Sequence, residues 1–150
     1  MVKKIIIGFL ILIAVSLALS FKTLASPSNS QTIGVYAKGQ GLEKYFSGAI
    51  NHGFCYEVSS VTPEIYYSYD KDGEILGEFF KTTLTDFNLK TFEKEYGLTI
   101  VETKFIDSIY NIYAKSALLP YKISGKNFNV QIAINGENVI VASPIIMGSY

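Results

Sequence analysis

The C-terminal stretch from Asn127 to Tyr150 constrains the fold of this chain more than any other part of the sequence. Asn135-Gly136 stands between two alternating runs, and Asn-Gly is the pair that best tolerates the positive φ angles of a type I′ turn. A two-residue loop there would pair Ile134 with Glu137. The residues then expected on one face are Phe128, Val130, Ile132, Val139 and Val141. Because an isolated hairpin is at best marginally stable, this face predicts a larger sheet with an apolar cover.

Composition limits the size of the fold and the class of partner. The chain has 150 residues, 49% of them hydrophobic, which suits one domain with one core. All 13 basic residues are lysines, and three precede Ser26, so ten lysines meet 13 acidic residues in the remainder, a net charge of −3. Nucleic acid is therefore not expected as a partner, since phosphate binding needs a concentrated cationic surface. Because Cys55 and His52 are the only residues of their kinds, no zinc site of cysteines and histidines is possible, and we expect no metal or cofactor.

Residues 1–30 have the pattern of an export segment followed by a polar spacer. Lys3-Lys4 precedes an uncharged apolar run from residue 5 to residue 19. Cleavage after Ser20 or after Ala25 would give a signal peptide, and an uncleaved segment would remain as a single membrane anchor. Both alternatives place the domain of residues 31–150 outside the cytoplasm, secreted or anchored, because positive charge precedes the apolar run. Membrane contact is expected only through this N-terminal segment.

Apolar spacing predicts an α+β domain: an antiparallel sheet of about six strands with two to three helices packed on one face. The expected helices span residues 42–50, 74–84 and 89–96. The expected strands span residues 33–37, 54–61, 64–69, 98–105 and 109–116, followed by the two arms of the hairpin. The helix over residues 74–84 would bury Phe79 and Phe80 and, together with Phe46, would cover the apolar face of the hairpin. Gly97 is expected to end the helix over residues 89–96.

Two patterns suggest chemistry, and for both a structural interpretation is preferred. His52 and Cys55 resemble a base and a nucleophile, but no third group is identifiable to orient the imidazole. The run Asp70–Glu74 resembles a calcium loop, yet Phe79 would stand where a bidentate Glu is required, so a turn with Asp72 as helix N-cap is favoured. We therefore predict no catalytic residue and no metal site.

Tyrosine is unusually frequent, with 11 residues in the chain. Six of them are candidates for an aromatic surface that binds an envelope protein or peptide, because tyrosine combines a large contact area with one polar group. These are Tyr66, Tyr67, Tyr69, Tyr110, Tyr113 and Tyr121. The alternative is that tyrosine is simply a favourable strand residue.

The end of the chain resembles a known family. A strand such as Asn129–Ala133, a turn, a second strand and then Ser-Pro-Ile-Ile with a terminal Tyr resemble the C-terminal signature of the YwmB-like proteins, exported proteins of spore-forming Gram-positive bacteria. The residues that carry this likeness are Asn135, Gly136, Ser143, Pro144, Ile145, Ile146 and Tyr150. Family members have Glu before the terminal Tyr, where this chain has Ser149. The resemblance implies export, a curved antiparallel sheet like that of the TATA-box-binding protein with helices on its convex side, and no assigned activity.

These observations favour an extracytoplasmic, non-enzymatic module that binds a protein or peptide through an exposed sheet face or an edge strand. A role in sporulation is a further hypothesis that follows from the resemblance. One alternative is a small envelope hydrolase, which would need a pocket joining His52 to at least two carboxylates. The other is a binding protein with a pocket for a small apolar ligand beneath the helices.

Overall fold

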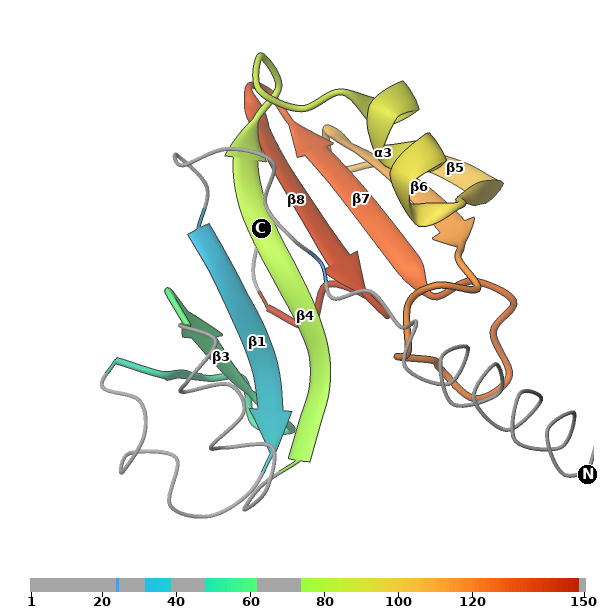
Figure 1. Cartoon of the computed structure of the whole chain (residues 1–150). Coiled ribbons are helices and arrows are strands. Elements are labelled where there is room, and N and C mark those ends of the chain that lie inside the picture. Colours follow the sequence, from blue (N-terminus) through green and yellow to red (C-terminus); the bar gives the residue numbers. More distant parts are fainter. Residues whose placement is uncertain (1–23, 25–31, 39–47, 62–73, 149–150) are drawn as a thin grey trace, which may run out of the picture.

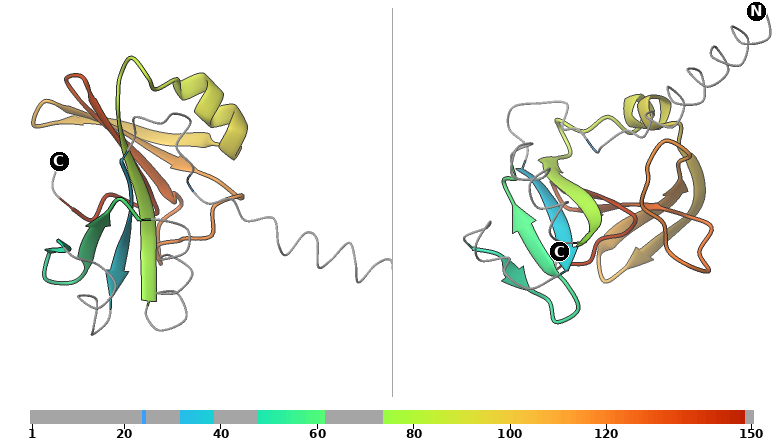
Figure 2. Two further views of the ribbon diagram at one scale, coloured as in Figure 1. Left: turned by 60° about the vertical axis from the view of Figure 1, so that its left-hand side comes forward. Right: turned by 60° about the horizontal axis from the view of Figure 1, so that its bottom comes forward.

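One antiparallel sheet organises the described part of the chain (Figure 1). The structure is a computed structural model, and it describes residue 24 and residues 32–38, 48–61 and 74–148. The elements are β1 (Thr32–Lys38), β2 (Ile50–Asn51), β3 (Tyr56–Ser59), β4 (Glu74–Thr83), α3 (Leu89–Tyr96), β5 (Thr99–Ile106), β6 (Ile109–Lys115), β7 (Val130–Asn135) and β8 (Asn138–Ser143). The strands lie in the order β2-β3-β1-β4-β8-β7-β6-β5. Figure 2 shows a strong twist, with β5 and β6 crossing the direction of β1 and β4.

The described residues contain eight strands and one short helix, so the prediction of about six strands with two to three helices is wrong. The main error concerns residues 74–84, because Glu74–Thr83 forms the long central strand β4. Phe79 and Phe80 are both fully buried although neighbours in a strand point to opposite faces. Here both faces of the sheet are covered, and a strand buried on both sides has adjacent apolar residues that imitate helical spacing.

The helix predicted over residues 42–50 can be compared with the structure only at its C-terminal end, where the prediction is wrong. Ile50 belongs to strand β2, and residues 42–47 lie outside the described residues. The expected strand over residues 64–69 and the calcium-like run up to Gly73 also lie outside them. Within the described part of the chain, no helix has the length and apolar character needed to cross a membrane.

The helix α3 forms over the predicted residues, and both of its ends are capped. The Asn88 side chain accepts a hydrogen bond from the Thr91 N–H at 2.9 Å, which satisfies one of the free donors at the helix start. Gly97 has φ 58° and ψ 45°, a left-handed conformation, and its N–H bonds the Glu93 carbonyl. The predicted helix over residues 89–96 with Gly97 after it is confirmed.

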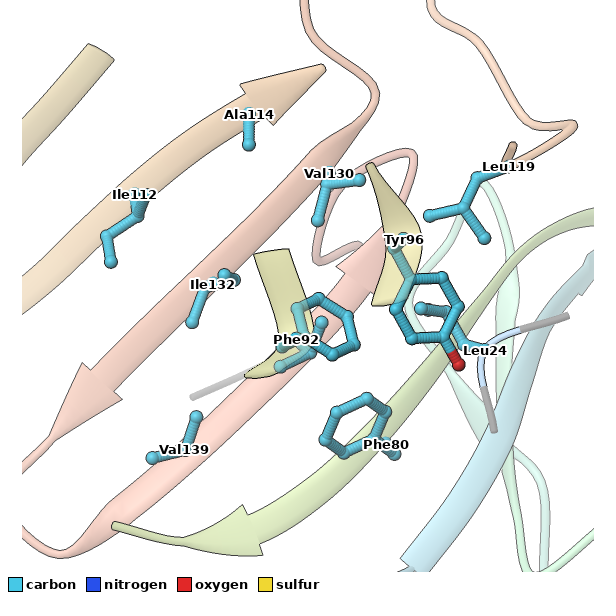
Figure 3. Packing of buried hydrophobic residues seen from close by; sticks show 11 residues of the cluster. Leu24, Phe80, Phe92, Tyr96, Ile112, Ala114, Leu119, Val130, Ile132 and Val139 are labelled. Carbon is cyan, nitrogen blue, oxygen red and sulfur yellow. The ribbon is translucent and has the colours of Figure 1, made fainter. Parts of the chain in front are cut away.

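The face of the sheet covered by α3, called the helix face below, carries the main core. Figure 3 shows Phe92 and Tyr96 of α3 directed toward Phe80 of β4 and toward the hairpin strands. The Phe80 and Phe92 rings meet edge to face, with centroids 5.8 Å apart. The other buried members of this cluster are Leu24, Ile112, Ala114, Leu119, Val130, Ile132, Val139 and Val141. Four of the five side chains expected on one face of the hairpin therefore lie together in this core.

The hairpin of β7 and β8 has a turn one residue later than predicted. Asn135 pairs with Asn138 and Ile134 with Val139, so Gly136 and Glu137 form the turn. Gly136 has φ 58°, and the positive φ at the first central residue is the pattern of a type II′ turn, not of the predicted type I′. The change shifts each cross-strand partner by two residues, which leaves the side chains within β7 and β8 on their predicted faces.

Phe128 is the fifth of those predicted side chains, and it does not join the core. β7 begins only at Val130, so the strand alternation does not extend back to residue 128. The Phe128 ring instead contacts the Tyr113 ring, with centroids 4.8 Å apart.

The opposite face of the sheet, called the tail face below, is covered in part by the C-terminal tail, residues 144–148. Tyr36 of β1, Phe79 of β4 and Ala142 of β8 form a buried cluster there, and the tail residues Ile146 and Met147 pack against it. The Ile146 N–H donates to Gln131 Oε1 at 3.1 Å. The Ser-Pro-Ile-Ile part of the family-like motif thus forms the end of β8 and this covering tail, while Tyr150 lies outside the described residues.

Asn129, just before β7, connects the sheet to the segment that follows β6. Its side chain is buried; Oδ1 accepts from the Ser116 N–H at 2.7 Å. Nδ2 donates to the carbonyls of Ser116, Leu119 and Tyr121 at 2.9, 3.3 and 3.2 Å. This one amide therefore satisfies four backbone groups of a segment that has no regular structure of its own.

Candidate functional site

The six tyrosines predicted as an aromatic surface are not gathered in one place by the described structure. Tyr66, Tyr67 and Tyr69 lie outside the described residues. Tyr110 and Tyr113 are both on β6 but three positions apart, so their side chains point to opposite faces. Tyr110 is exposed beside Phe105, whereas Tyr113 stacks on Phe128 on the tail face. Tyr121 donates a long hydrogen bond of 3.4 Å to Glu78 Oε1.

A buried carboxylate is the centre of the strongest polar cluster. Glu57 of β3 is 3% exposed, and its two oxygens accept from Lys81 Nζ at 2.7 Å and contact His52 Nε2 at 3.0 Å. β3 and β4 bring these groups together on the tail face although Glu57 and Lys81 are 24 residues apart in the sequence. A buried carboxylate is stable only when it is paired, and this one has a cation and an imidazole.

The C-terminal tail closes over this cluster. A Cβ added at Gly148 would collide with Glu57 Oε2 and would lie 3.1 Å from His52 Nε2, so the tail backbone contacts both groups directly. The Tyr36 hydroxyl forms hydrogen bonds with the backbone of Met147 and Gly148. Burial raises the pKa of Tyr36 far above its usual range, the negative charge of Glu57 adds to this rise, and the tail hydrogen bonds oppose it. The cluster therefore holds the tail against the sheet.

The pairing of His52 with Cys55 that the sequence suggested is a backbone contact. The His52 N–H donates to the Cys55 carbonyl at 2.9 Å, while the imidazole contacts Glu57. The Cys55 side chain is buried, and burial raises its pKa, with the charge of Glu57 as a second cause. A buried thiol that resists ionisation is a poor nucleophile, because the thiolate is the reactive form.

Neither metal chemistry nor a deep ligand pocket is evident in the described ranges. Among those residues, no three His, Cys, Asp or Glu side chains are grouped so that they could hold a metal ion. A hollow of about 260 Å³ lies on the tail face where β4 passes the turn of the hairpin. It is lined by Lys81, Thr82, Ala133, Asn135, Asn138, Val139 and Ile140. This hollow has a mainly apolar lining, and it is not beneath α3, where the core cluster fills the space.

The largest exposed feature of the described sheet is its edge strand β5. Every residue from Thr99 to Ile106 is exposed, and the strand order places β5 at the end of the sheet, paired with β6. The opposite edge, β2, has two residues. An edge strand presents a row of backbone N–H and C=O groups that another strand can bind.

Apolar side chains accompany this backbone edge. Phe105 is 72% exposed, and the other exposed apolar residues here are Ile100, Val101, Ile106 and, on the neighbouring strand, Tyr110. The charged side chains of β5, Glu102 and Lys104, form an exposed ion pair of 3.0 Å with each other. Residue Val101 is an extra residue in the strand, since the register with β6 shifts between Ile100 and Glu102.

The sequence of β5 itself contains a pattern typical of an exposed apolar strand. Thr99–Ile106 carries apolar residues at both odd and even positions with only one charge of each sign. A strand at a sheet edge with one solvated face usually alternates between apolar and polar residues. Exposed apolar residues on both faces of a strand are typical of an interaction surface.

Comparisons with protein-family models, with curated proteins and with solved structures give no match to this chain. The fold alone therefore defines the class, a twisted antiparallel sheet covered by one helix on one face and by a C-terminal tail on the other. The resemblance to the YwmB-like proteins stays a prediction.

Proposed function

We propose that this protein is a non-enzymatic interaction module that binds another protein chain by strand addition at β5. The observation that carries the proposal is the complete exposure of this eight-residue edge strand together with its apolar side chains. In strand addition, main-chain hydrogen bonds supply affinity and alternate side chains supply specificity. A long exposed edge strand with apolar side chains is a template for pairing with another chain.

The remainder of the described sheet supports this assignment because it offers little other accessible surface of the same kind. The helix face is covered by α3, and the tail face around Tyr36 and Phe79 is covered by Ile146 and Met147. Glu102 offsets the charge of Lys104 on β5, so the edge does not repel a partner of either sign. An extended, mainly apolar protein segment is the ligand that fits.

The hydrolase alternative finds less support in the cluster around His52. That hypothesis needs two carboxylates beside the imidazole, and within the described residues His52 contacts one, Glu57. Glu57 is also engaged by Lys81, and the tail lies across both His52 and Glu57. A carboxylate paired with a cation and shielded by backbone serves to hold the tail in place.

The test of strand addition is site-specific photocrosslinking in the cells that make the protein. A photoreactive phenylalanine analogue at position 105 should form a discrete adduct with a protein chain, because Phe105 projects from the edge. The matched control carries the analogue at Asn51, which is exposed on β2 at the opposite edge of the sheet. Equal adducts from both positions, or none from position 105, would contradict the proposal.

The proposal places this module outside the cytoplasm, secreted or held by its N-terminal segment. Support comes from the export pattern of residues 1–30 and from Leu24, which is buried in the helix-face core and donates its N–H to Glu78 Oε2 at 2.8 Å. Cleavage after Ala25 would remove this core residue, so retention of Leu24, by cleavage after Ser20 or by no cleavage, is the expectation. N-terminal sequencing of the cell-derived protein tests the retention of Leu24, and a start at residue 26 would contradict it. Protease treatment of intact cells tests the location outside the cytoplasm.

A further inference from the structure

We infer that the strand added at β5 comes from a second copy of this chain, related to the first by a two-fold axis. The inference rests on the proposed function, since it names the partner of the same edge. What carries it is the order of side chains at the centre of β5, which reads Val101, Glu102, Thr103, Lys104, Phe105.

Symmetry limits how two copies of one strand can pair. An axis along the strand would make the two strands parallel, so antiparallel pairing across an isologous interface requires an axis perpendicular to the sheet. The residue at that axis then lies opposite itself. Residues equally far from it in the two directions lie opposite each other on the same face. Each possible dimer is therefore defined by one central residue.

Three central residues would keep most of β5 paired, and the charges that each register brings together distinguish between them. Centring on Glu102 places two carboxylates directly opposite each other, and centring on Lys104 does the same with two ammonium groups. Centring on Thr103 places Glu102 of each copy opposite Lys104 of the other. Because like charges directly opposite are destabilising and unlike charges are stabilising, the Thr103 register is the one that the sequence favours.

The apolar residues agree with the same register. With Thr103 at the axis, the extra residue Val101 lies near Phe105 of the second copy. Both side chains are exposed in the isolated chain. Glu102 and Lys104 already form a pair within one chain, so the dimer joins two such pairs into a ring of alternating charges.

The interface is small, and this sets the conditions of the test. The extra residue at Val101 ends the regular ladder on one side of the axis, which confines the pairing to the middle of the strand. An interface at or below about 1,200 Å² is typical of weak association. We therefore expect a dimer that dissociates in the micromolar range and that must be measured over a wide concentration series.

Disulfide trapping tests the register. In the Thr103→Cys variant of the full chain, purified in mild detergent, the two introduced thiols would lie opposite each other with Cα atoms about 5 Å apart, within disulfide reach. In the Thr99→Cys control on the same strand, the two thiols would be about 26 Å apart. We expect an oxidised dimer from the first variant and little from the second. Equal trapping of both variants, or of neither, would overturn the inference.

A charge exchange tests the same register without a covalent bond. Sedimentation velocity should show that Glu102→Lys and Lys104→Glu each raise the dimer dissociation constant, by about tenfold, because each single change puts two like-charged pairs in the interface. The double variant Glu102→Lys/Lys104→Glu restores unlike pairs and should return to within about threefold of the native value. A double variant as weak as the single variants would overturn the inference.

The identity of the photocrosslinked adduct separates this inference from the proposed function. A dimer of this chain, identified by peptide mass, supports both. An adduct that contains a different protein, together with no disulfide dimer from Thr103→Cys, overturns the second-copy assignment and leaves strand addition at β5 in place. Absence of any adduct at position 105 overturns both.

Discussion

The clearest test of the packing concerns Asn129, whose side-chain amide holds the segment after β6 against the sheet. Asn129→Asp keeps the shape of the side chain and the acceptor for the Ser116 N–H, but it removes a donor shared by three carbonyl oxygens at 2.9, 3.3 and 3.2 Å. Each buried carbonyl left without a partner costs about 1 kcal/mol. We therefore expect the free energy of unfolding to fall by about 3 kcal/mol at neutral pH, a large part of the ~5–15 kcal/mol of a typical domain.

The pH dependence of this loss has a definite sign. A carboxyl introduced at position 129 would face carbonyl oxygens in a buried site, so its pKa in the folded state would lie above its unfolded value of about 3.9. The ionised form is thus the destabilising one. The deficit relative to the native chain should be fully present at neutral pH and should shrink as the pH falls through the folded pKa, because a protonated carboxyl can again donate one hydrogen bond.

Urea unfolding followed by circular dichroism measures the effect, with Asn138→Asp as the matched control. Asn138→Asp is the same substitution at an exposed position of the β7–β8 hairpin, where the free energy of unfolding should fall by about 0.5 kcal/mol or less. Thermal unfolding should show a fall of about 10 °C for the buried variant. A difference of less than about 1 kcal/mol between the two variants would refute the role assigned to the Asn129 network.

Two further outcomes follow from the tail face. Gly77→Ala should lower the free energy of unfolding by about 1–3 kcal/mol in the same urea assay. The added Cβ would lie 2.5 Å from the Ser143 carbonyl oxygen, directly before the tail. A variant as stable as the native chain would show that the backbone there does not pack closely against β4. At neutral pH, a thiol reagent should label Cys55 slowly in the folded chain and rapidly in urea. Burial and the charge of Glu57 raise the pKa of the Cys55 thiol, and the thiolate is the reactive form. Equal rates in the folded and unfolded chains would contradict the burial of this thiol.

The correct part of the sequence prediction came from local signals. Gly97 after residue 96 marks the C-terminal end of α3, as predicted, and its effect is confined to one helical turn. Asp107 and Ser108 join β5 to β6 with φ angles of 50° and 67°, in the gap between the strands predicted over residues 98–105 and 109–116. Four of the five residues predicted for the apolar face of the β7–β8 hairpin lie in the core, because a shift of two residues in the partner leaves strand alternation unchanged.

The sequence could not show which side chains would meet across the sheet. Glu57 and Lys81 are 24 residues apart, and their contact depends on β3, β1 and β4 being neighbours in the strand order. The same holds for the tail, since Gly148 reaches Glu57 only after the chain turns back across the sheet beyond β8. Such contacts between distant residues are fixed by topology and leave no regular spacing in the sequence.

The sequence by itself determined an antiparallel sheet, a C-terminal hairpin with most of its core face, one short helix and a net charge of −3 after residue 25. Only the tertiary structure decided that Glu74–Thr83 is a strand and that β5 is an exposed edge. The reason is that the spacing of apolar residues shows which residues are buried. Whether these residues form a helix or a strand depends on what covers each of their faces. Phe79 and Phe80 are adjacent and both buried because the tail covers one and α3 the other, an arrangement that exists only once the whole sheet has formed.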